Sequence, residues 1–160
     1  AGIMAREDLL ADPVDLAVAE AIVATNILGP IRLTAALLPH LRRQSAAAVM
    51  NVTSGLAFVP LTATPTYSAS KAAVTHMGKV LAREWARSGP NINLISPGYI
   101  RSELAGDWFE TEGGKKQINS WPRRRMLDDD ALDSTLLFLL SEASRNVTGS
   151  DFVIDDGQSL

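Results

Sequence analysis

The chain has 160 residues, of which 46% are apolar and 21% charged, and its formal net charge is -3 at pH 7. These values exclude the basic surface of a nucleic-acid-binding domain and the composition of a disordered chain, and the lack of cysteine excludes disulfides and thiolate metal sites. Because no run reaches the ~18 apolar residues of a membrane span and residues 1–10 lack the layout of a signal peptide, we expect a globular cytoplasmic protein without a membrane or nucleic-acid partner.

The first predicted element is a long helix. Asp12-Pro13 is typical of an N-cap followed by the first helical residue, and the helix is predicted to reach about Arg43 with a bend at Gly29-Pro30. Since Pro30 has no N–H, the carbonyl oxygen of Asn26 lacks its helical donor and needs another partner, for which water is the simplest. Taken alone, Asn26 is equally explained as an ordinary asparagine inside a helix, but the missing N–H of Pro30 favours a bound water at its carbonyl.

A strand, a helix and a second strand follow. Residues 46–53 form a short, partly β-branched apolar run that predicts a buried strand, with Ser54 at its carboxyl end. Residues 91–96 predict the next strand, which ends at Pro97-Gly98, and a helix that starts near Thr66 lies between the two. Ligands bind such β-α-β units beyond the carboxyl ends of the strands, so Ser54 and Pro97-Gly98 lie where a site is expected.

The helix between these strands carries the most informative pattern, Tyr67-Ser68-Ala69-Ser70-Lys71. Tyr67 and Lys71 share one helix face with their Cβ atoms ~6 Å apart. A cation ~4 Å from a phenol, at an effective dielectric constant of ~20, supplies about 4 kcal/mol, which is what moving a tyrosine pKa from ~10 to neutrality requires. We therefore expect Lys71 to lower the pKa of Tyr67, so that the phenol serves as an acid or base in carbonyl or alcohol chemistry.

An isolated Y-x-x-x-K pattern is more often a surface pair than a site. The strand context and Ser54, thirteen residues before the tyrosine, favour the functional interpretation.

The rest of the chain predicts a loop, a helix and a last strand. Residues 103–127 contain Gly113-Gly114 and have no clear period, which suits either a flexible lid over an apolar substrate or a plain surface loop. Residues 128–141 predict a helix, and residues 151–155 predict a strand. The residues of that helix expected to face inward are Leu132, Leu136, Leu139 and Leu140. His40 and His76 have no second ligand at a metal-binding spacing, so no metal site is expected.

The motifs occur in a fixed order: Ala1-Gly2 as the end of an N-A-G motif, Asn26, Asn51 to Ser54, Tyr67 to Lys71, Pro97 to Ser102, and Val147-Thr148-Gly149 with Asp155-Asp156-Gly157. In this order they resemble the classical short-chain dehydrogenase/reductase family, over the C-terminal two thirds of its length. The stretch Asn51 to Thr66 is also similar to oxidoreductases associated with D-alanylation of lipoteichoic acid. The part after Gly89 looks more like generic bacterial members, so that narrower role is not transferred.

The resemblance implies an α/β fold, a partial Rossmann-type doubly wound parallel sheet made of the last three strands and their helices. Residues 1–160 would form a single, incomplete dinucleotide-binding and catalytic domain. The implied activity is NAD(P)-dependent interconversion of a small ketone or aldehyde and an alcohol by hydride transfer. Tyr67 would be the general acid/base, Ser54 would bond the substrate oxygen, Lys71 would lower the pKa of Tyr67 and hold the nicotinamide ribose, and Asn26 would hold a water of a proton relay.

The same resemblance implies the cofactor-binding residues Gly2, Tyr67, Lys71, Pro97, Gly98, Ile100 and Ser102. Gly98 would let the backbone pass close to the nicotinamide ring, and Ile100 and Ser102 would bond the carboxamide, with serine in place of the usual threonine. Whether the cofactor is NAD or NADP is undecidable, because the discriminating residues follow the second strand of the family, which this chain does not contain.

The family also packs the long helix and the Tyr67 helix against their copies in a second subunit. An apolar stripe on the long helix is at a spacing that most often packs into the core, but it also fits such a homodimer or homotetramer: Ile27, Ile31, Thr34, Leu38 and Leu41.

No G-x-G-x-x-G or G-x-x-x-G-x-G phosphate loop occurs among the eleven glycines, and the chain opens inside the N-A-G motif. We therefore expect a fragment, an incompletely recorded chain or a truncated gene product, which alone neither binds NAD or NADP detectably nor stays a monomer. Three functions remain open: the catalytic part of an oxidoreductase, a non-catalytic remnant that only oligomerises, and an epimerase or dehydratase on the same fold.

Overall fold

A parallel sheet of three strands lies at the centre of the chain, in the order β1 (Ala48–Val52), β2 (Asn91–Pro97) and β3 (Asp151–Ile154). The computed structural model describes residues 2–10, 15–44, 46–87, 89–101 and 103–160. β2 is the central strand and its interior is completely buried, as is usual for a parallel sheet covered on both faces. The buried interior includes two polar side chains, Asn93 and Ser96, which bond the Val147 carbonyl and the Asp151 carboxylate. The strand predictions are confirmed to within two residues at each end.

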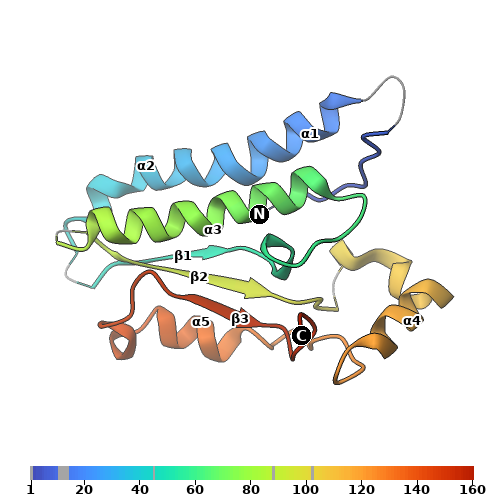
Figure 1. Cartoon of the computed structure of the whole chain (residues 1–160). Coiled ribbons are helices and arrows are strands. Elements are labelled where there is room, and N and C mark those ends of the chain that lie inside the picture. Colours follow the sequence, from blue (N-terminus) through green and yellow to red (C-terminus); the bar gives the residue numbers. More distant parts are fainter. Residues whose placement is uncertain (1, 11–14, 45, 88, 102) are drawn as a thin grey trace.

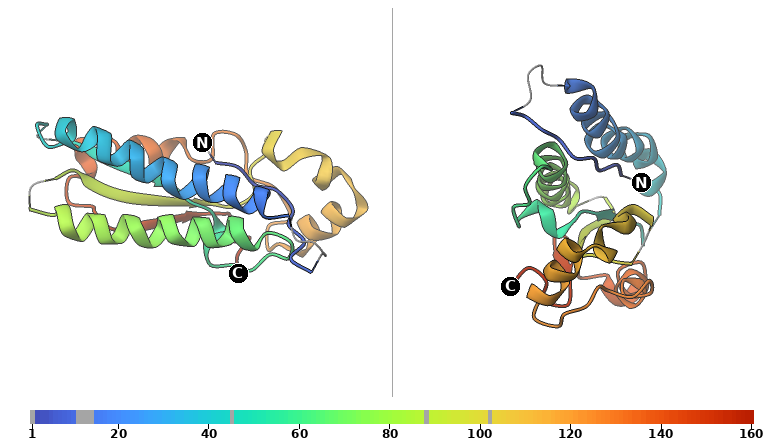
Figure 2. Two further views of the ribbon diagram at one scale, coloured as in Figure 1. Left: turned by 90° about the horizontal axis from the view of Figure 1, so that it is seen from above. Right: turned by 90° about the vertical axis from the view of Figure 1, so that its right-hand side faces the viewer.

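Helices cover both faces of the sheet (Figures 1 and 2). On one face, α3 (Pro65–Trp85) packs against β2, and α1 (Leu16–Val23) and α2 (Gly29–Leu41) run beside α3. On the other face lies α5 (Asp133–Leu139). This two-sided covering is the α/β arrangement expected from the sequence.

The long first helix differs from the prediction in two details. Asp15 is its N-cap, with Oδ1 accepting the N–H of Ala17 at 2.9 Å, whereas Asp12 and Pro13 lie outside the described residues. Instead of a simple bend, five residues form a π-helical segment, η1 (Ala24–Leu28), in which the Gly29 N–H reaches the Ala24 carbonyl. Pro30 explains the segment, because it cannot donate the ordinary bond to Asn26 and the helix widens locally.

Three shorter helical turns and one more helix complete the chain: η2 (Gly55–Ala57), η3 (Glu103–Glu110), α4 (Glu112–Ser120) and η4 (Glu142–Ser144). η3 and α4 stand beyond the carboxyl ends of the strands (Figure 1). Residues 103–127 are therefore largely helical, which the lack of a clear apolar period had hidden. Leu140 was expected to face inward but is 59% exposed, because α5 ends at Leu139.

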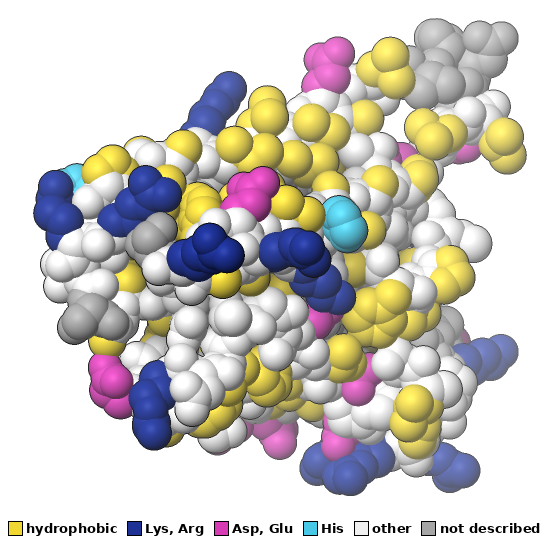
Figure 3. All heavy atoms as spheres, turned by 60° about the vertical axis from the view of Figure 1, so that its left-hand side comes forward, with side chains coloured by type: hydrophobic (Ala, Val, Ile, Leu, Met, Phe, Trp, Pro, Cys, Tyr) yellow, Lys and Arg dark blue, Asp and Glu magenta, His cyan; other side chains and the backbone are white. Residues whose placement is uncertain are grey.

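The continuous helix Leu16–Leu41 is long and apolar enough to cross a membrane, and only 11% of its most apolar stretch is buried. The helix contains no unbroken apolar run of the length expected for a membrane span, but its mean hydropathy of 1.6 meets a test of length and composition. The test is weak evidence because helices of soluble proteins also pass it. Figure 3 shows apolar side chains gathered over this part of the surface, and Leu16, Ile31, Leu33 and Leu37 are among the exposed ones.

Candidate active site

The carboxyl ends of β1 and β2 and the first turns of α3 form the candidate site. Ser54 follows β1 in extended conformation, and its hydroxyl oxygen accepts the N–H of Leu56 at 3.2 Å, which starts η2. Tyr67 lies in the first turn of α3 and is 7% exposed. Lys71 follows one turn later, as the i, i+4 spacing predicts.

Burial raises the pKa of Tyr67, the neighbouring Ser54 hydroxyl lowers it in part, and Tyr99 raises it further. The Lys71 Nζ lies 5.7 Å from the centroid of the Tyr67 ring and donates to the Val52 carbonyl at 3.1 Å. Burial lowers the pKa of Lys71 itself. Burial thus has the largest effect on the pKa of Tyr67, in the direction opposite to the lowering expected from Lys71, whose ammonium is partly engaged by the Val52 carbonyl.

Asn26 is buried in η1, and both of its amide hydrogens are used within the chain. Its Oδ1 accepts the Ile3 N–H at 2.9 Å, and its Nδ2 donates to the Ile3 carbonyl at 2.9 Å and to the Ser70 Oγ at 3.1 Å. The Ser70 hydroxyl in turn donates to the Tyr67 carbonyl at 2.7 Å. Asn26 therefore ties the N-terminal segment to the turn that carries Tyr67, while a relay through its backbone carbonyl stays a prediction.

Gly2 meets the same group of residues. A Cβ atom at this position would lie 3.4 Å from both the Asn26 Oδ1 and the Lys71 Nζ. Four predicted site residues, Gly2, Asn26, Tyr67 and Lys71, are thus brought together, with Ser54 beside Tyr67.

The segment after β2 is held by the C-terminus of the chain. A Cβ on Gly98 would overlap the Gln158 carboxamide and would lie 2.8 Å from the Cβ of Asp155. Gln158 accepts the Tyr99 N–H at 2.7 Å and donates to the Arg125 carbonyl at 3.2 Å. In this structure the glycine is therefore required by the close approach of the C-terminal turn, a reason that differs from the predicted cofactor contact.

Ile100 forms a bridge with Leu127, and Pro97 precedes Gly98 at the end of β2, with its carbonyl oxygen 3.6 Å from the position of a Cβ on Gly55. Ser102 lies outside the described residues. The segment that follows Gly98 thus starts beside the Ser54 turn and is paired with residues just before α5.

An aromatic cluster lies between this segment and α4. Tyr99 stacks on Trp121 with ring centroids 5.2 Å apart and meets Phe109 edge-on at the same distance. Phe109, Trp121 and Met126 are buried together. The predicted lid is therefore anchored by packed rings at its base.

Sequence analysis did not single out Gln158, or Glu7, whose contact with α3 is described below. The bonds of Gln158 to Tyr99 and of Glu7 to Thr66 each join residues 59 positions apart. The only sequence signal for Gln158 is its position directly after the Asp155-Asp156-Gly157 turn, and Glu7 has none.

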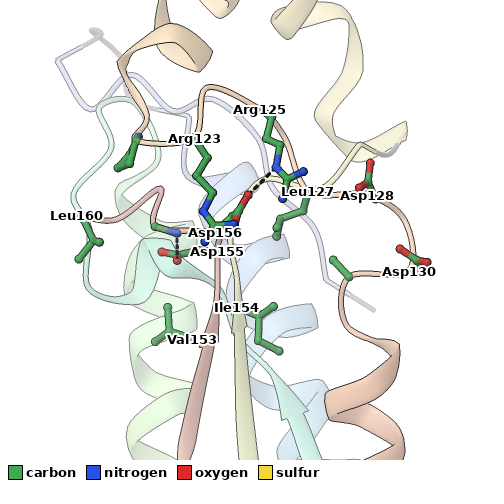
Figure 4. Close-up of a pocket in the computed structure, with 13 residues that line it drawn as sticks. Arg123, Arg125, Leu127, Asp128, Asp130, Val153, Ile154, Asp155, Asp156 and Leu160 are labelled. Carbon is green, nitrogen blue, oxygen red and sulfur yellow. Dashed lines mark hydrogen bonds and ion pairs between the residues drawn. The ribbon is translucent and has the colours of Figure 1, made fainter.

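A cavity of about 670 Å³ lies away from Tyr67, between the segment before α5 and the end of β3 (Figure 4). Arg123 and Arg125 pair with Asp156 at its rim, at 3.1 and 2.7 Å. None of the predicted catalytic residues lines it, so this cavity does not mark the candidate site. Within the described part of the chain, His, Cys, Asp and Glu form no group of three or more that could hold a metal.

Comparison with known proteins agrees with this arrangement. A family model described as enoyl-(acyl carrier protein) reductase matches residues 1–159. L-xylulose reductase from Caenorhabditis elegans is 30% identical over 138 residues, which cover 85% of this chain and 55% of that protein. The chain thus spans about half the length of the curated relatives it matches.

Two solved structures superpose over 99% of the chain. Gluconate 5-dehydrogenase from Burkholderia cenocepacia, in complex with NADP and tartrate, has a TM-score of 0.92 at 26% identity, and 62% of its chain is covered. A 4-hydroxyisoleucine dehydrogenase mutant complexed with NADH and succinate has a TM-score of 0.89 at 26% identity, with 65% covered. Because this family model matches residues 1–159 of the chain, the chain belongs to the classical short-chain dehydrogenase/reductase family.

Proposed function

We propose that this chain is the catalytic part of an NAD(P)-dependent oxidoreductase that interconverts a small ketone or aldehyde and an alcohol. The observation that carries the proposal is the placement of a buried phenol, Tyr67, beside the Ser54 hydroxyl and with the Lys71 ammonium over its ring, at the carboxyl edge of a parallel sheet. That edge is where ligands bind in doubly wound folds.

In the direction of reduction, Tyr67 donates its phenolic proton to the carbonyl oxygen of the substrate while the carbonyl carbon receives a hydride. Ser54 donates a hydrogen bond to the same oxygen and so stabilises the negative charge that develops there. The products are the alcohol and a Tyr67 phenolate, which Lys71 stabilises until a proton returns through the relay proposed at Asn26. In the direction of oxidation, the phenolate removes the alcohol proton.

The residues present fit the nicotinamide and ribose end of a dinucleotide. The Lys71 Nζ uses one N–H for the Val52 carbonyl at 3.1 Å and has two further donors for ribose hydroxyls. Gly2, Pro97, Gly98, Ile100 and Ser102 are the remaining proposed contacts. When bound, the cofactor supplies or accepts the hydride. The two solved structures above hold NADP and NADH, so either cofactor fits the proposal.

The substrate is proposed by class only. The matched relatives are named for xylulose, threitol and gluconate chemistry, and these reactions share a carbonyl that becomes a secondary alcohol. We propose that residues 103–127 cover the substrate, with the rings of Tyr99, Phe109 and Trp121 as their packed base.

Homo-oligomerisation and a cytoplasmic location are part of the same proposal. The apolar helix Leu16–Leu41 is mostly exposed, yet it carries Asn26 at the site and lies beside α3. A second copy of the chain would cover this surface without a membrane, and no nucleic-acid partner is proposed for a chain of net charge -3.

Deuterium transfer tests the reaction class. Full-length protein is incubated with reduced cofactor deuterated at C4 of the nicotinamide and with small ketones that include L-xylulose. A reductase places the deuterium on the carbinol carbon of the alcohol. An epimerase or dehydratase instead returns the label to the cofactor, and a non-catalytic remnant leaves it there, so either result would contradict the proposal.

A further inference from the structure

The helix that carries Tyr67 lacks a side-chain cap from its own N-cap residue. The side chain of that residue, Thr64, accepts no backbone N–H of the first turn. The Thr64 hydroxyl instead donates to the Leu61 carbonyl at 3.1 Å and lies 3.3 Å from the Ser68 hydroxyl. Because Pro65 lacks an N–H, Thr66 has the first amide of α3 that needs an acceptor.

Glu7 supplies that acceptor from a distant part of the chain. Its Oε2 accepts the Thr66 N–H at 2.9 Å, across 59 residues of sequence. Glu7 as a whole residue is 9% exposed, and its Oε1 is buried without a hydrogen-bond partner among the described residues. A carboxylate at a helix N-terminus is favoured by the helix dipole, which accounts for a buried acid at this position.

The backbone of Glu7 holds the turn before the helix as well. Its N–H donates to the Ala63 carbonyl at 2.9 Å, and Ala63 has a φ of 60°. An alanine in this left-handed region is strained, so the turn needs outside support. Glu7 thus forms hydrogen bonds to both Ala63 and Thr66, which lie on either side of the helix start.

Tyr67 directly follows Thr66, so its position depends on the hydrogen bond between Thr66 and Glu7. The segment that contains Glu7 also reaches the next turn of α3, since Ile3 is bonded to Asn26 and Asn26 to Ser70. Two anchors, one before Tyr67 and one after it, connect residues 3–7 to the catalytic helix. A first turn without its cap would fray and let the phenol move relative to Ser54.

We propose that Glu7 is a positioning residue for Tyr67: its buried carboxylate supplies the side-chain cap that Thr64 does not give to α3, and so fixes the phenol beside Ser54 and Lys71. The consequence for catalysis depends on the proposed function, whereas the anchoring of Tyr67 does not.

The test compares Glu7→Ala and Glu7→Gln in the full-length protein, with Asp8→Ala as the matched control. Asp8 is the neighbouring acid, and among the described residues its carboxylate bonds only the local N–H of Leu10, at 3.0 Å and exposed to solvent. Three properties are measured: hydrogen exchange of the Thr66 amide, the NMR signal of ¹³C-labelled tyrosine assigned with Tyr67→Phe, and kcat with KM.

For Glu7→Ala we expect Thr66 exchange to accelerate about fivefold, the equilibrium factor of one lost N-cap. The Tyr67 signal should shift or broaden, and kcat should fall at least tenfold with little change in KM. Glu7→Gln keeps an oxygen that accepts the Thr66 N–H, so it should restore all three properties to near wild-type values. Asp8→Ala should change none of them.

Unchanged Thr66 exchange and an unchanged Tyr67 signal in Glu7→Ala would overturn the inference, even if kcat fell. If Glu7→Ala does not fold, Glu7→Asp replaces it, because Asp keeps the charge but is one methylene too short. An active Glu7→Asp beside an inactive Glu7→Gln would then contradict the proposal. A wild-type protein without turnover would defeat the proposed function alone, since the exchange and NMR results stand without activity.

Discussion

Tyr67 is held as a neutral phenol by its surroundings. Its burial raises the pKa more than the Ser54 hydroxyl lowers it, and the Lys71 ammonium is shared with the Val52 carbonyl. A phenol in this state is a proton donor at neutral pH, which suits reduction of a carbonyl. It becomes a base only when the pH or another positive charge in the site favours the phenolate.

The first prediction concerns the titration of this phenol in the cofactor-free protein. We expect Tyr67 to titrate above the ordinary tyrosine value of ~10. The folded state then binds the proton more tightly than the unfolded chain, so this contribution to stability is present below pH ~10 and is lost as the pH rises through the folded pKa. Absorbance of tyrosinate, corrected by subtraction of the Tyr67→Phe titration, measures it. A titration midpoint of Tyr67 near neutrality would contradict this prediction, because the effect of Lys71 on the pKa would then exceed that of burial.

At the scale of elements, the sequence predicted regular segments better than irregular ones. β2 was predicted to within one residue at each end, and the start of the Tyr67 helix, expected near Thr66, lies at Pro65. The π-helical turn at Asn26 and the helix α4 were missed, because the first depends on the missing N–H of Pro30 and the second contains two glycines. Residues that are close in sequence or at strand ends could be placed in the candidate site from sequence.

The contacts of Glu7 and Gln158 could not be predicted, since they arise only when segments 59 residues apart pack together. The roles of the site residues remain predictions, although the structure places Ser54, Asn26, Tyr67 and Lys71 in one neighbourhood.

The second prediction concerns Gly113 and Gly114, which sequence analysis interpreted as a source of flexibility. A Cβ on Gly114 would overlap the backbone of Trp108 and Phe109, whereas a Cβ on Gly113 would meet only the far edge of the Trp108 ring, at 2.8 Å. Gly114→Ala should therefore destabilise the fold by about 1–3 kcal/mol, and Gly113→Ala by less than ~1 kcal/mol, because a side chain moves more easily than backbone. Urea unfolding measures both free energies. Equal effects would indicate that α4 adapts as a flexible lid.

At the scale of the whole molecule, the mostly exposed apolar helix Leu16–Leu41 contrasts with the buried interior of β2. The exposed apolar residues of this helix are neighbours and form one continuous patch, unlike the scattered apolar side chains that are common on protein surfaces. One side of this helix carries Asn26 at the candidate site, and its exposed side can pack against a second copy of the chain.

The third prediction follows from that surface. Leu33, on α2, is 62% exposed, and Leu137, on α5 across the sheet, is 72% exposed. Leu33→Glu should dissociate the oligomer of the full-length protein, because a charge would be buried in the interface, while Leu137→Glu should leave it intact. Light scattering distinguishes the two. Dissociation by Leu137→Glu alone would place the interface on α5 instead.

The central claim is that Tyr67 transfers the proton, and its replacement by phenylalanine tests this most directly. In the full-length protein, Tyr67→Phe keeps the ring and its packing, so cofactor affinity should stay within a few-fold of wild type while the turnover rate falls by at least about 10³-fold, within the range of general acid catalysis. Tyr99→Phe removes the same hydroxyl from the second tyrosine of the chain and should keep most of the rate. Steady-state oxidation of the reduced cofactor gives both values. A Tyr67→Phe protein that keeps a tenth of the wild-type rate would contradict the account.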